Sequence, residues 1–284
     1  MGPPSPPGAL VATIAQGSKR IRPAAVCMLE SGRLPRRPHA VLFDVYGTLL
    51  ARIGDRHPHP AARERAVEAL IRRHSLQTSS SDLSANLVSA VDREHSALRA
   101  RGNASPEVAI ESIWAGLFPG RSRDELQAMI VEYELATHPV WPMPGCGPLL
   151  RRLRDLGVTL GIISNAQFYT PLFLHALLNA NLEDLGFTAD LCLFSWRFGT
   201  AKPDPGLFEL ARQKLQARGL SGEETAMVGN DAANDVAPAA KTGLMTVLAA
   251  LDSRSFQPAS RTSAQPDAVI RRLRSLERLV STAE

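Results

Sequence analysis

The chain has 284 residues, of which 44% are hydrophobic and 21% are charged, an ordinary composition for a soluble globular protein. Its net charge of +4 comes from scattered basic residues, with no dense run interleaved with aromatic side chains, which argues against a nucleic-acid partner. No apolar stretch approaches the ~20 residues that a membrane helix requires. The length allows a core domain and a second module.

The cysteines and the first residues suggest where the protein works. Cys27, Cys146 and Cys192 are odd in number and lack metal-ligand spacing, which favours a reducing, cytoplasmic location. Residues 1–38 contain seven prolines and few periodic apolar positions, so we expect a disordered or poorly packed leader. The apolar run 10–15 is too short for a signal-peptide core and has its basic residues on the wrong side.

The first predicted strand is the apolar run 40–43, which ends at Asp44. A carboxylate at the carboxyl end of a buried strand, followed by a turn containing glycine, lies where open α/β sheets place their reactive groups. Carboxylates can form covalent intermediates, so Asp44 is a candidate nucleophile. The structural alternative is an Asp that only caps the turn.

After this strand, residues 60–138 show helical periodicity and no strand pattern. Four amphipathic helices are predicted there, at 61–75, 82–100, 106–118 and 123–137. Pro106 is expected at the first helical position of the third.

From Trp141 onward, strand-like and helix-like segments alternate, which predicts a parallel sheet. Strands are expected at 158–163, 191–194, 225–228 and 244–249, and helices at 147–156, 169–178, 205–217, 233–242 and 267–279.

Three further polar stations follow Asp44 along the chain. The second predicted strand ends in Ser164-Asn165, Lys202 opens the sequence Lys-Pro-Asp-Pro, and the run 226–229 precedes Asp231 and Asp235. Lys202 is one of four lysines among 32 basic residues, which suggests that a compact ammonium is required there.

The order Asp, Ser, Lys, Asp-x-x-x-Asp, with three of the stations after strand-like runs, resembles the haloacid dehalogenase-like (HAD) hydrolase superfamily. The resemblance covers roughly residues 38–274. It implies the α/β class, with a Rossmann-like doubly wound parallel sheet as core and a second, smaller all-helical cap domain. The expected parts are a leader at 1–38, a core at 39–56 and 139–284, and a cap at 57–138.

The resemblance also implies roles for the stations. Asp44 would attack the substrate, and Mg²⁺ would be held by Asp44, the backbone carbonyl of Tyr46, Asp231 and Asp235. Mg²⁺ prefers few protein carboxylates together with water and substrate oxygens. The structural alternative for Asp231 and Asp235 is capping of the following helix.

Substrate binding would fall to Thr48, Ser164, Asn165 and Lys202. Ser164 would donate a hydrogen bond to a phosphate oxygen, and Lys202 would act in catalysis by stabilising negative charge. An N-cap serine and a solvated loop lysine are the structural alternatives, and Thr48 could equally brace the turn.

Tyr46 departs from the phosphatase pattern, in which a second Asp at this position is the general acid and base. A phenol, with a usual pKa near ~10, can donate a proton as a catalytic acid but is a poor base near neutrality. The Asp-x-Tyr-Gly-Thr-Leu form is similar to that of the L-2-haloacid dehalogenases, which work without metal. The retained acids Asp231 and Asp235 favour the phosphatases instead.

The sequence therefore predicts a hydrolase, with Mg²⁺-dependent hydrolysis of a small phosphorylated metabolite through a covalent aspartyl intermediate as the first hypothesis. The alternatives are a metal-independent 2-haloacid dehalogenase and a catalytically weak binding or regulatory protein with the same fold. We expect a small-molecule substrate, no nucleic-acid or membrane partner, a monomer or homodimer, and a cytoplasmic location.

Overall fold

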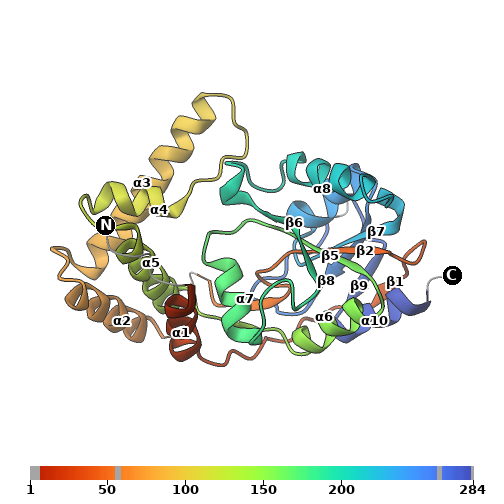
Figure 1. Cartoon of the computed structure of the whole chain (residues 1–284), viewed down its shortest axis with the longest axis horizontal. Coiled ribbons are helices and arrows are strands. Elements are labelled where there is room, and N and C mark those ends of the chain that lie inside the picture. The colour runs from red at the N-terminus through yellow and green to blue at the C-terminus, as the bar shows by residue number, and fades with distance from the viewer. Residues whose placement is uncertain (1–6, 55–58, 261–263, 283–284) are drawn as a thin grey trace.

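The computed structural model of the chain describes residues 7–54, 59–260 and 264–282. A seven-stranded sheet with the order β1-β9-β8-β7-β2-β5-β6 forms its centre. All neighbouring pairs are parallel except β1 and β9. In sheet order the strands are Ser31–Gly32, Ala268–Ile270, Met245–Ala249, Thr225–Gly229, Ala40–Phe43, Thr159–Ser164 and Phe187–Phe194. Helices lie on both faces of this sheet (Figure 1), which confirms the predicted fold class.

Strand β2 shows why the sheet has two apolar faces. Its four residues are all fully buried, and their side chains alternate between two clusters. Val41 and Phe43 join the cluster that contains residues of α6 (Cys146–Asp155), α7 (Thr170–Leu178) and α10 (Leu273–Thr282). Ala40 and Leu42 join the cluster formed with α8 (Gly206–Gln216) and α9 (Ala237–Lys241). A strand covered on both faces must be apolar throughout, as the sequence indicated.

The helical group lies at one end of the molecule (Figure 1) and consists of α2 (Pro60–Arg73), α3 (Ser80–Ala100), α4 (Ile110–Leu117) and α5 (Arg123–Thr137). Ser79 caps α3, and Ser122 with Glu125 forms a capping box on α5. A small antiparallel two-stranded sheet, β3 (Leu50–Arg52) with β4 (Val140–Pro142), carries the chain into and out of this group. The expected domain boundary between residues 56 and 57 lies outside the described residues.

Helix α4 begins later than predicted, and the predicted helix start at Pro106 is wrong. Pro106 forms an isolated antiparallel bridge with Thr200 of the core, and Glu107 donates its backbone N–H to Gly199. These contacts hold the segment extended until Ile110, where the helix starts.

The C-terminal helix predicted at 267–279 also begins later, at Leu273. Ala268–Ile270 form strand β9 instead, because they pair with β8, while the Asp267 carboxylate accepts hydrogen bonds from the backbone and side chain of Thr246. The helix predicted at 233–242 is divided into a π-helical turn, η3 (Ala232–Val236), and α9. The remaining short turns are η1 (Ser195–Arg197) and η2 (Gly222–Glu224).

The expectation of a disordered or poorly packed leader is wrong for the described part of residues 1–38. Helix α1 (Pro7–Gly17) packs against both α5 and α7, and Figure 1 shows it between the helical group and the core. Leu10 and Ile14, four residues apart on one helix face, are 6% and 0% exposed. The prolines lie mostly outside this helix, so their number concealed a short apolar face.

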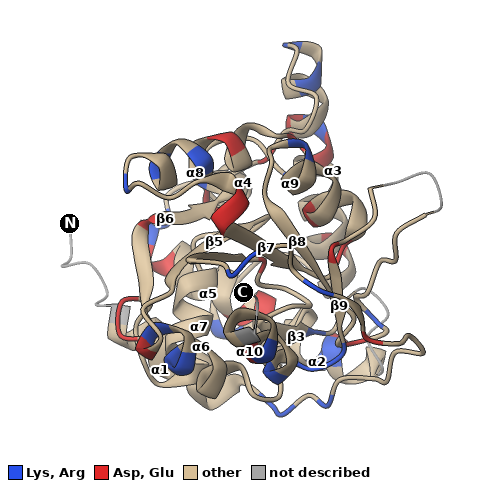
Figure 2. Ribbon diagram, turned by 90° about the vertical axis from the view of Figure 1, so that its right-hand side faces the viewer, with Lys and Arg blue, Asp and Glu red and all other residues tan. Residues whose placement is uncertain are grey.

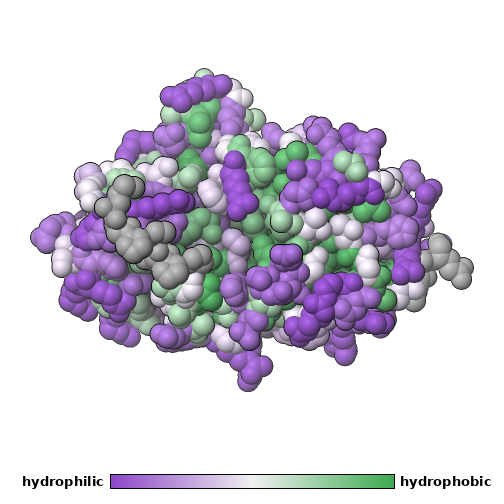
Figure 3. All heavy atoms as spheres, in the orientation of Figure 1, coloured by the Kyte–Doolittle hydropathy of each residue, from purple (hydrophilic) through white to green (hydrophobic). Residues whose placement is uncertain are grey.

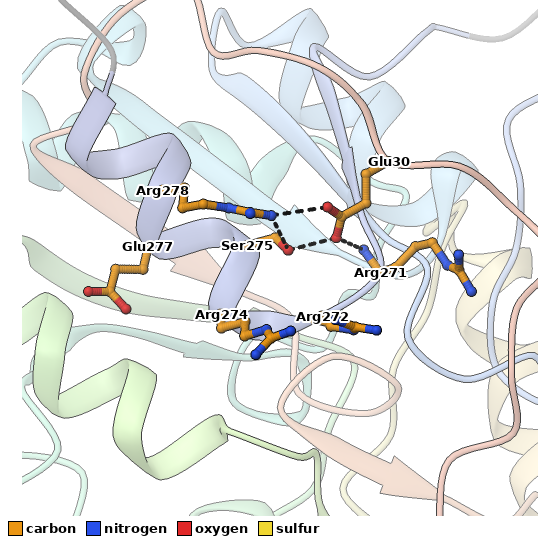
Figure 4. Close-up of a pocket in the computed structure, with 7 residues that line it drawn as sticks. All are labelled: Glu30, Arg271, Arg272, Arg274, Ser275, Glu277 and Arg278. Carbon is orange, nitrogen blue, oxygen red and sulfur yellow. Dashed lines mark hydrogen bonds and ion pairs between the residues drawn. The ribbon is translucent and has the colours of Figure 1, made fainter.

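A second contact fastens the leader to the C-terminal helix. One oxygen of Glu30 accepts hydrogen bonds from the Arg271 backbone at 2.9 Å and the Ser275 hydroxyl at 2.6 Å, and the other accepts from Arg278 at 3.2 Å. These bonds, led by that from Ser275, lower the pKa of Glu30. Figure 4 shows the carboxylate directed into an arginine-lined surface cleft of about 540 Å³. Glu30 thus supplies this cleft with an anion from the chain itself.

The surface carries charges of both signs. Along α3 and α8, positions of Lys and Arg are interspersed with positions of Asp and Glu (Figure 2). Hydrophilic side chains cover much of the face in Figure 3, with apolar side chains gathered in its middle, between the helical group and the core. Within the described ranges, no helix combines the length and apolar character needed to cross a bilayer.

Candidate active site

The active-site candidates meet at the carboxyl edge of the sheet. Strands β2, β5 and β7 are parallel neighbours with Phe43 aligned to Ile162 and Val228, so the residues after them converge. The Lys202 ammonium donates to Asp44 Oδ1 at 2.8 Å and to Asp235 Oδ1 at 2.5 Å. The structure thus brings together Asp44 and the predicted partner Lys202.

Asp44 has one anchored oxygen and one that the surrounding residues leave available. Oδ1 accepts the bond from Lys202 and a second from the Ser164 hydroxyl at 3.1 Å. Oδ2 accepts no hydrogen bond from the described residues, although the residue is 7% exposed. Two bonds to one oxygen fix the carboxylate's orientation and leave the other oxygen without a hydrogen-bond donor among the described residues.

Lys202 is 5% exposed, and all three of its N–H donors are used, the third by the Ile163 carbonyl at 3.0 Å. Burial alone would lower the pKa of Lys202. Asp235 and then Asp44 raise it by more than burial lowers it, so the pKa lies above its usual value and the ammonium stays charged. For Asp235, burial is the largest influence and raises the pKa to about 6, against the opposing attraction of Lys202. One buried cation therefore serves two carboxylates.

The structure does not bring Asp231, a predicted metal ligand, to this group. Its Oδ1 accepts from the backbone N–H groups of Ala233 and Asn234 at 2.8 and 3.0 Å, and its Oδ2 accepts from the Asn234 side chain at 2.7 Å. Asp231 therefore caps the turn η3, which is the structural alternative for this residue. The prediction for Asp235 differs, because that carboxylate faces Lys202. Across the described ranges, no three His, Cys, Asp or Glu side chains are grouped to hold a metal.

Asn230 is a site residue that the sequence interpretation missed. It directly follows β7, as Asp44 follows β2, and its side-chain oxygen accepts from the Thr48 hydroxyl at 3.3 Å. A Cβ at Gly47, where φ is +91°, would lie 2.5 Å from the Asn230 amide nitrogen. Glycine is therefore required for this close approach. The first residue after a parallel strand was the signal available, and it pointed to position 230.

Thr48 and Asn165, predicted to bind substrate, are both engaged in positioning loops. Thr48 is fully buried and braces the turn after Asp44 through Asn230. Asn165 accepts the Lys202 backbone N–H at 2.7 Å and returns a bond to the Lys202 carbonyl at 3.0 Å. These paired bonds hold the Lys202 loop against the loop that carries Ser164.

The Tyr46 side chain points to helix α7 and to the two-stranded sheet β3–β4. Its hydroxyl lies 2.8 Å from the Thr170 hydroxyl, and the Arg52 guanidinium lies 5.1 Å from the ring centroid. Burial, followed by the charge of Glu134, raises the pKa of Tyr46 above its usual range. This phenol is therefore a weaker acid than an exposed tyrosine.

Arg52 and Glu134 form an ion pair that connects strand β3 to helix α5. The sequence analysis predicted a role for neither residue. Arg52 Nη2 lies 2.9 Å from Glu134 Oε1. Burial alone would raise the pKa of Glu134, but Arg52 and then His138 lower it more strongly, so the carboxylate is charged near neutrality. The pair lies beside Tyr46 and joins the turn after Asp44 to the helical group.

Comparisons with known proteins identify the family of the chain. A family model described as haloacid dehalogenase-like hydrolase matches residues 38–243. The chain is 34% identical over 145 residues to a ribulose-1,5-bisphosphate 5-phosphatase from Halopiger xanaduensis, a match that covers 49% of this chain and 56% of the relative. The match therefore spans little more than half of that phosphatase.

Two solved structures share the fold. A 2-haloacid dehalogenase from Pseudomonas syringae pv. Tomato has a TM-score of 0.54 at 21% identity, covering 85% of this chain and 97% of its own. A HAD phosphatase from Thermococcus onnurineus has a TM-score of 0.54 at 22% identity, covering 86% and 98%. The family model spans most of the chain and confirms both the predicted superfamily and the hydrolase class. The chain belongs to the haloacid dehalogenase-like hydrolase family.

Proposed function

We propose that this hydrolase removes phosphate from a small phosphorylated metabolite through a covalent intermediate on Asp44. The observation that carries the proposal is the pair of bonds from Lys202 and Ser164 to Asp44 Oδ1, which leaves Oδ2 without a hydrogen-bond donor among the described residues. The similarity to a phosphatase supports the choice of phosphate as the transferred group.

In the proposed reaction, Asp44 Oδ2 forms a bond to phosphorus as the bond to the leaving oxygen breaks. The leaving oxygen departs with the electron pair of that bond and takes its proton from solvent. Water then attacks phosphorus, releases inorganic phosphate and restores the carboxylate. Lys202, already charged and fixed, stabilises negative charge without reorganisation. Ser164 has one hydroxyl hydrogen, which it donates to Asp44 Oδ1 here. Once the substrate is bound, it would donate this hydrogen to a phosphate oxygen instead, and Lys202 would continue to hold Oδ1.

The residues at this edge suit a magnesium ion. Asp44 and Asp235 bring two carboxylates to one ammonium, so one negative charge is left for a cation to balance. Mg²⁺ typically binds through one or two carboxylates, with water and substrate phosphate as further ligands. We propose Asp44, Asp235 and the backbone carbonyl of Tyr46 as the holders, without Asp231. When bound, Mg²⁺ would neutralise the repulsion between an anionic nucleophile and an anionic phosphate.

The helical group is proposed as a cap, with residues 57–138 covering the carboxyl edge of the sheet. The two-stranded sheet β3–β4 supports this division, because the chain passes from the core to the helical group through β3 and returns through β4. A cytoplasmic location is proposed as well, since all three cysteines are free thiols and Cys146 and Cys192 are buried.

One observation favours a 2-haloacid dehalogenase as the second candidate. Tyr46 occupies the position of the usual general acid, yet its hydroxyl is paired with Thr170 and its pKa is raised. A halide leaves without a proton, so a dehalogenase would not require an acid there. A phosphatase with this site should accordingly prefer phosphates whose leaving groups are themselves acidic.

A substrate screen with and without Mg²⁺ tests the proposal. The panel contains alkyl phosphates, acyl phosphates, p-nitrophenyl phosphate and 2-haloacids. Phosphate release that stops with chelator is the expected result. Halide release that resists chelator would replace the first candidate by the second, and binding without turnover would favour the inactive binding protein.

Two carboxylates four residues apart provide a matched pair for the metal. Asp235→Asn should abolish Mg²⁺-dependent turnover, because Asp235 is proposed to hold the ion. Asp231→Asn should retain it, because Asp231 caps its own turn. Equal loss in both variants would contradict the ligand assignment.

A further inference from the structure

The segment that joins α3 to α4 lies against the core beside the Lys202 loop. We call residues 103–108 the docking segment. Its Ser105 carbonyl accepts the backbone N–H of Ala201 at 2.8 Å, and its Glu107 backbone N–H donates to Gly199 at 3.1 Å. Ala201 directly precedes Lys202, so a segment of the helical group fixes the backbone next to the ammonium-bearing residue.

Glu107 makes the deepest contact of this segment. Its Oε2 accepts the hydroxyl of Ser195 at 2.6 Å, and its Oε1 accepts the side-chain N–H of Gln167 at 3.2 Å. Gln167 also donates to the Val108 carbonyl at 2.8 Å. One carboxylate from the helical group thus holds two different core loops, one after β5 and one after β6.

These two loops carry the side chains that contact Asp44. The Ser195 hydroxyl accepts the backbone N–H of Ala166 at 2.9 Å, two residues after Ser164. The next residue back, Asn165, exchanges two hydrogen bonds with the backbone of Lys202. A continuous series of bonds therefore runs from Glu107 to both donors of Asp44.

The buried position of this series makes it dependent on Glu107. Ser195 is fully buried and Ala166 is 4% exposed, so water cannot readily replace the lost acceptor. Without Glu107 the Ser195 hydroxyl, as a donor, would keep only its longer 3.3 Å contact with the Ala166 carbonyl. A poorly partnered buried hydroxyl is costly, so the loops would shift to shorten this contact. The interaction was not apparent in the sequence, where Glu107 lay in a predicted helix start.

We propose that Glu107 is a positioning residue, through which docking of residues 103–108 sets the placement of Lys202 and Ser164 for turnover. This rests on the proposed function in so far as those two residues act on the substrate. The active site would then be complete only while this part of the helical group lies on the core.

Glu107→Ala is the main test, with two independent measurements. Hydrogen exchange by mass spectrometry should show faster exchange for peptides covering 164–167 and 195–202. With p-nitrophenyl phosphate and Mg²⁺, kcat should fall by on the order of 10- to 100-fold with little change in KM, because misplaced groups slow the chemical step. Glu107→Gln should recover part of both losses, since its amide oxygen can still accept from Ser195.

Glu111→Ala is the matched control, because the partners of Glu111, Arg123 and Gln127, both lie in the helical group. It should leave exchange in the core loops and kcat unchanged. Asn103→Ala, which removes a 2.9 Å bond to the Gly199 carbonyl, replaces Glu107→Ala if that variant does not fold. It should reproduce the effect more weakly.

The two measurements separate this inference from the proposed function. Unchanged exchange in 164–167 and 195–202 would overturn the positioning role, whatever the activity. Faster exchange with a lower kcat supports it. Faster exchange with unchanged turnover would also overturn the positioning role, because the loops would have loosened without any effect on the reaction, and the proposed function would still stand.

Discussion

At the residue scale, the site depends on how three buried charges are balanced. Lys202 lies between Asp44 and Asp235, and all three side chains are at least nine-tenths buried. Removing one partner of a buried ion pair leaves an uncompensated charge, which is strongly destabilising. Variants of these residues therefore need a check of folding before a loss of activity is assigned to chemistry.

Tyr46→Phe tests whether the phenol takes part in proton transfer. We expect turnover of both an alkyl phosphate and p-nitrophenyl phosphate to remain close to wild type, because the hydroxyl is bound to Thr170 and burial raises its pKa. General acid catalysis is typically worth ~10²–10⁴-fold, so its loss would be plain in steady-state rates. A fall of that size with an alkyl phosphate, but not with the nitrophenyl ester, would restore Tyr46 as the acid.

The resemblance to the superfamily grouped Asp44, Ser164 and Lys202 with Asp231 and Asp235, and the structure brings together all of these except Asp231. The sequence could not tell Asp231 from Asp235. Both follow β7 within six residues, and the direction of each side chain depends on the π-helical turn, which has no clear sequence pattern. Asn230 was not predicted, because an uncharged amide is neither a nucleophile nor an acid and its residue type does not indicate a catalytic role.

At the scale of elements, the two-stranded sheet β3–β4 joins the turn after Asp44 to the helical group. The turn ends at Leu50, which opens β3, and Arg52 at the end of the same strand pairs with Glu134 of α5. Tyr46 packs beneath that arginine. A movement of α5 would therefore be transmitted to the turn after Asp44 through this ion pair.

Glu134→Gln should lower stability near neutral pH and have little effect in acid. The folded protein holds the pKa of Glu134 below its usual 4.5, so the stabilisation is present above that value and lost as pH falls through the folded pKa. Denaturant unfolding at pH 7 and pH 4 measures the difference between the two proteins. It should shrink at the lower pH.

The exposed Glu64 provides the control, and Glu64→Gln should leave stability unchanged at both pH values. A penalty for Glu134→Gln that stays constant with pH would show that packing, not charge, accounts for it.

Long helices were predictable at this scale, and short strands were not. The predictions for α3 and α5 fall within two residues of the structure because each has apolar periodicity and an N-terminal serine cap. β1 and β9 contain two and three residues, and β3 and β4 three each. Such segments are too short for a periodic pattern, and only pairing with a distant partner makes them strands.

For the whole molecule, the N-terminal helix is the main departure from the sequence prediction. Helix α1 contacts both α5 and α7, so one short element bridges the helical group and the core. Glu30 then fastens the same leader to α10. Deleting residues 1–34 would remove both contacts, so we expect it to destabilise the protein, contrary to the prediction for a disordered leader.

Ile14→Ala isolates the contribution of α1 without removing the leader. Ile14 is fully buried, and such a truncation typically costs about 2–5 kcal/mol. The melting temperature should therefore fall by several degrees. Leu29→Ala is the matched control in the same leader, because Leu29 is 81% exposed and its loss should change stability little. Equal melting temperatures for all three proteins would place α1 outside the stable fold.

Chemical trapping of a covalent intermediate tests whether Asp44 is the nucleophile. The enzyme is mixed with an intact phosphate ester that it hydrolyses, and the reaction is quenched rapidly. The protein is then reduced with borohydride, which converts an aspartyl phosphate to homoserine. Mass spectrometry of the peptide spanning residues 40–50 should show homoserine at Asp44 only after exposure to substrate. Asp44→Asn should lack both the modification and turnover while remaining folded. Turnover in the wild type with no reduced Asp44, or with the label on another carboxylate, would contradict the account.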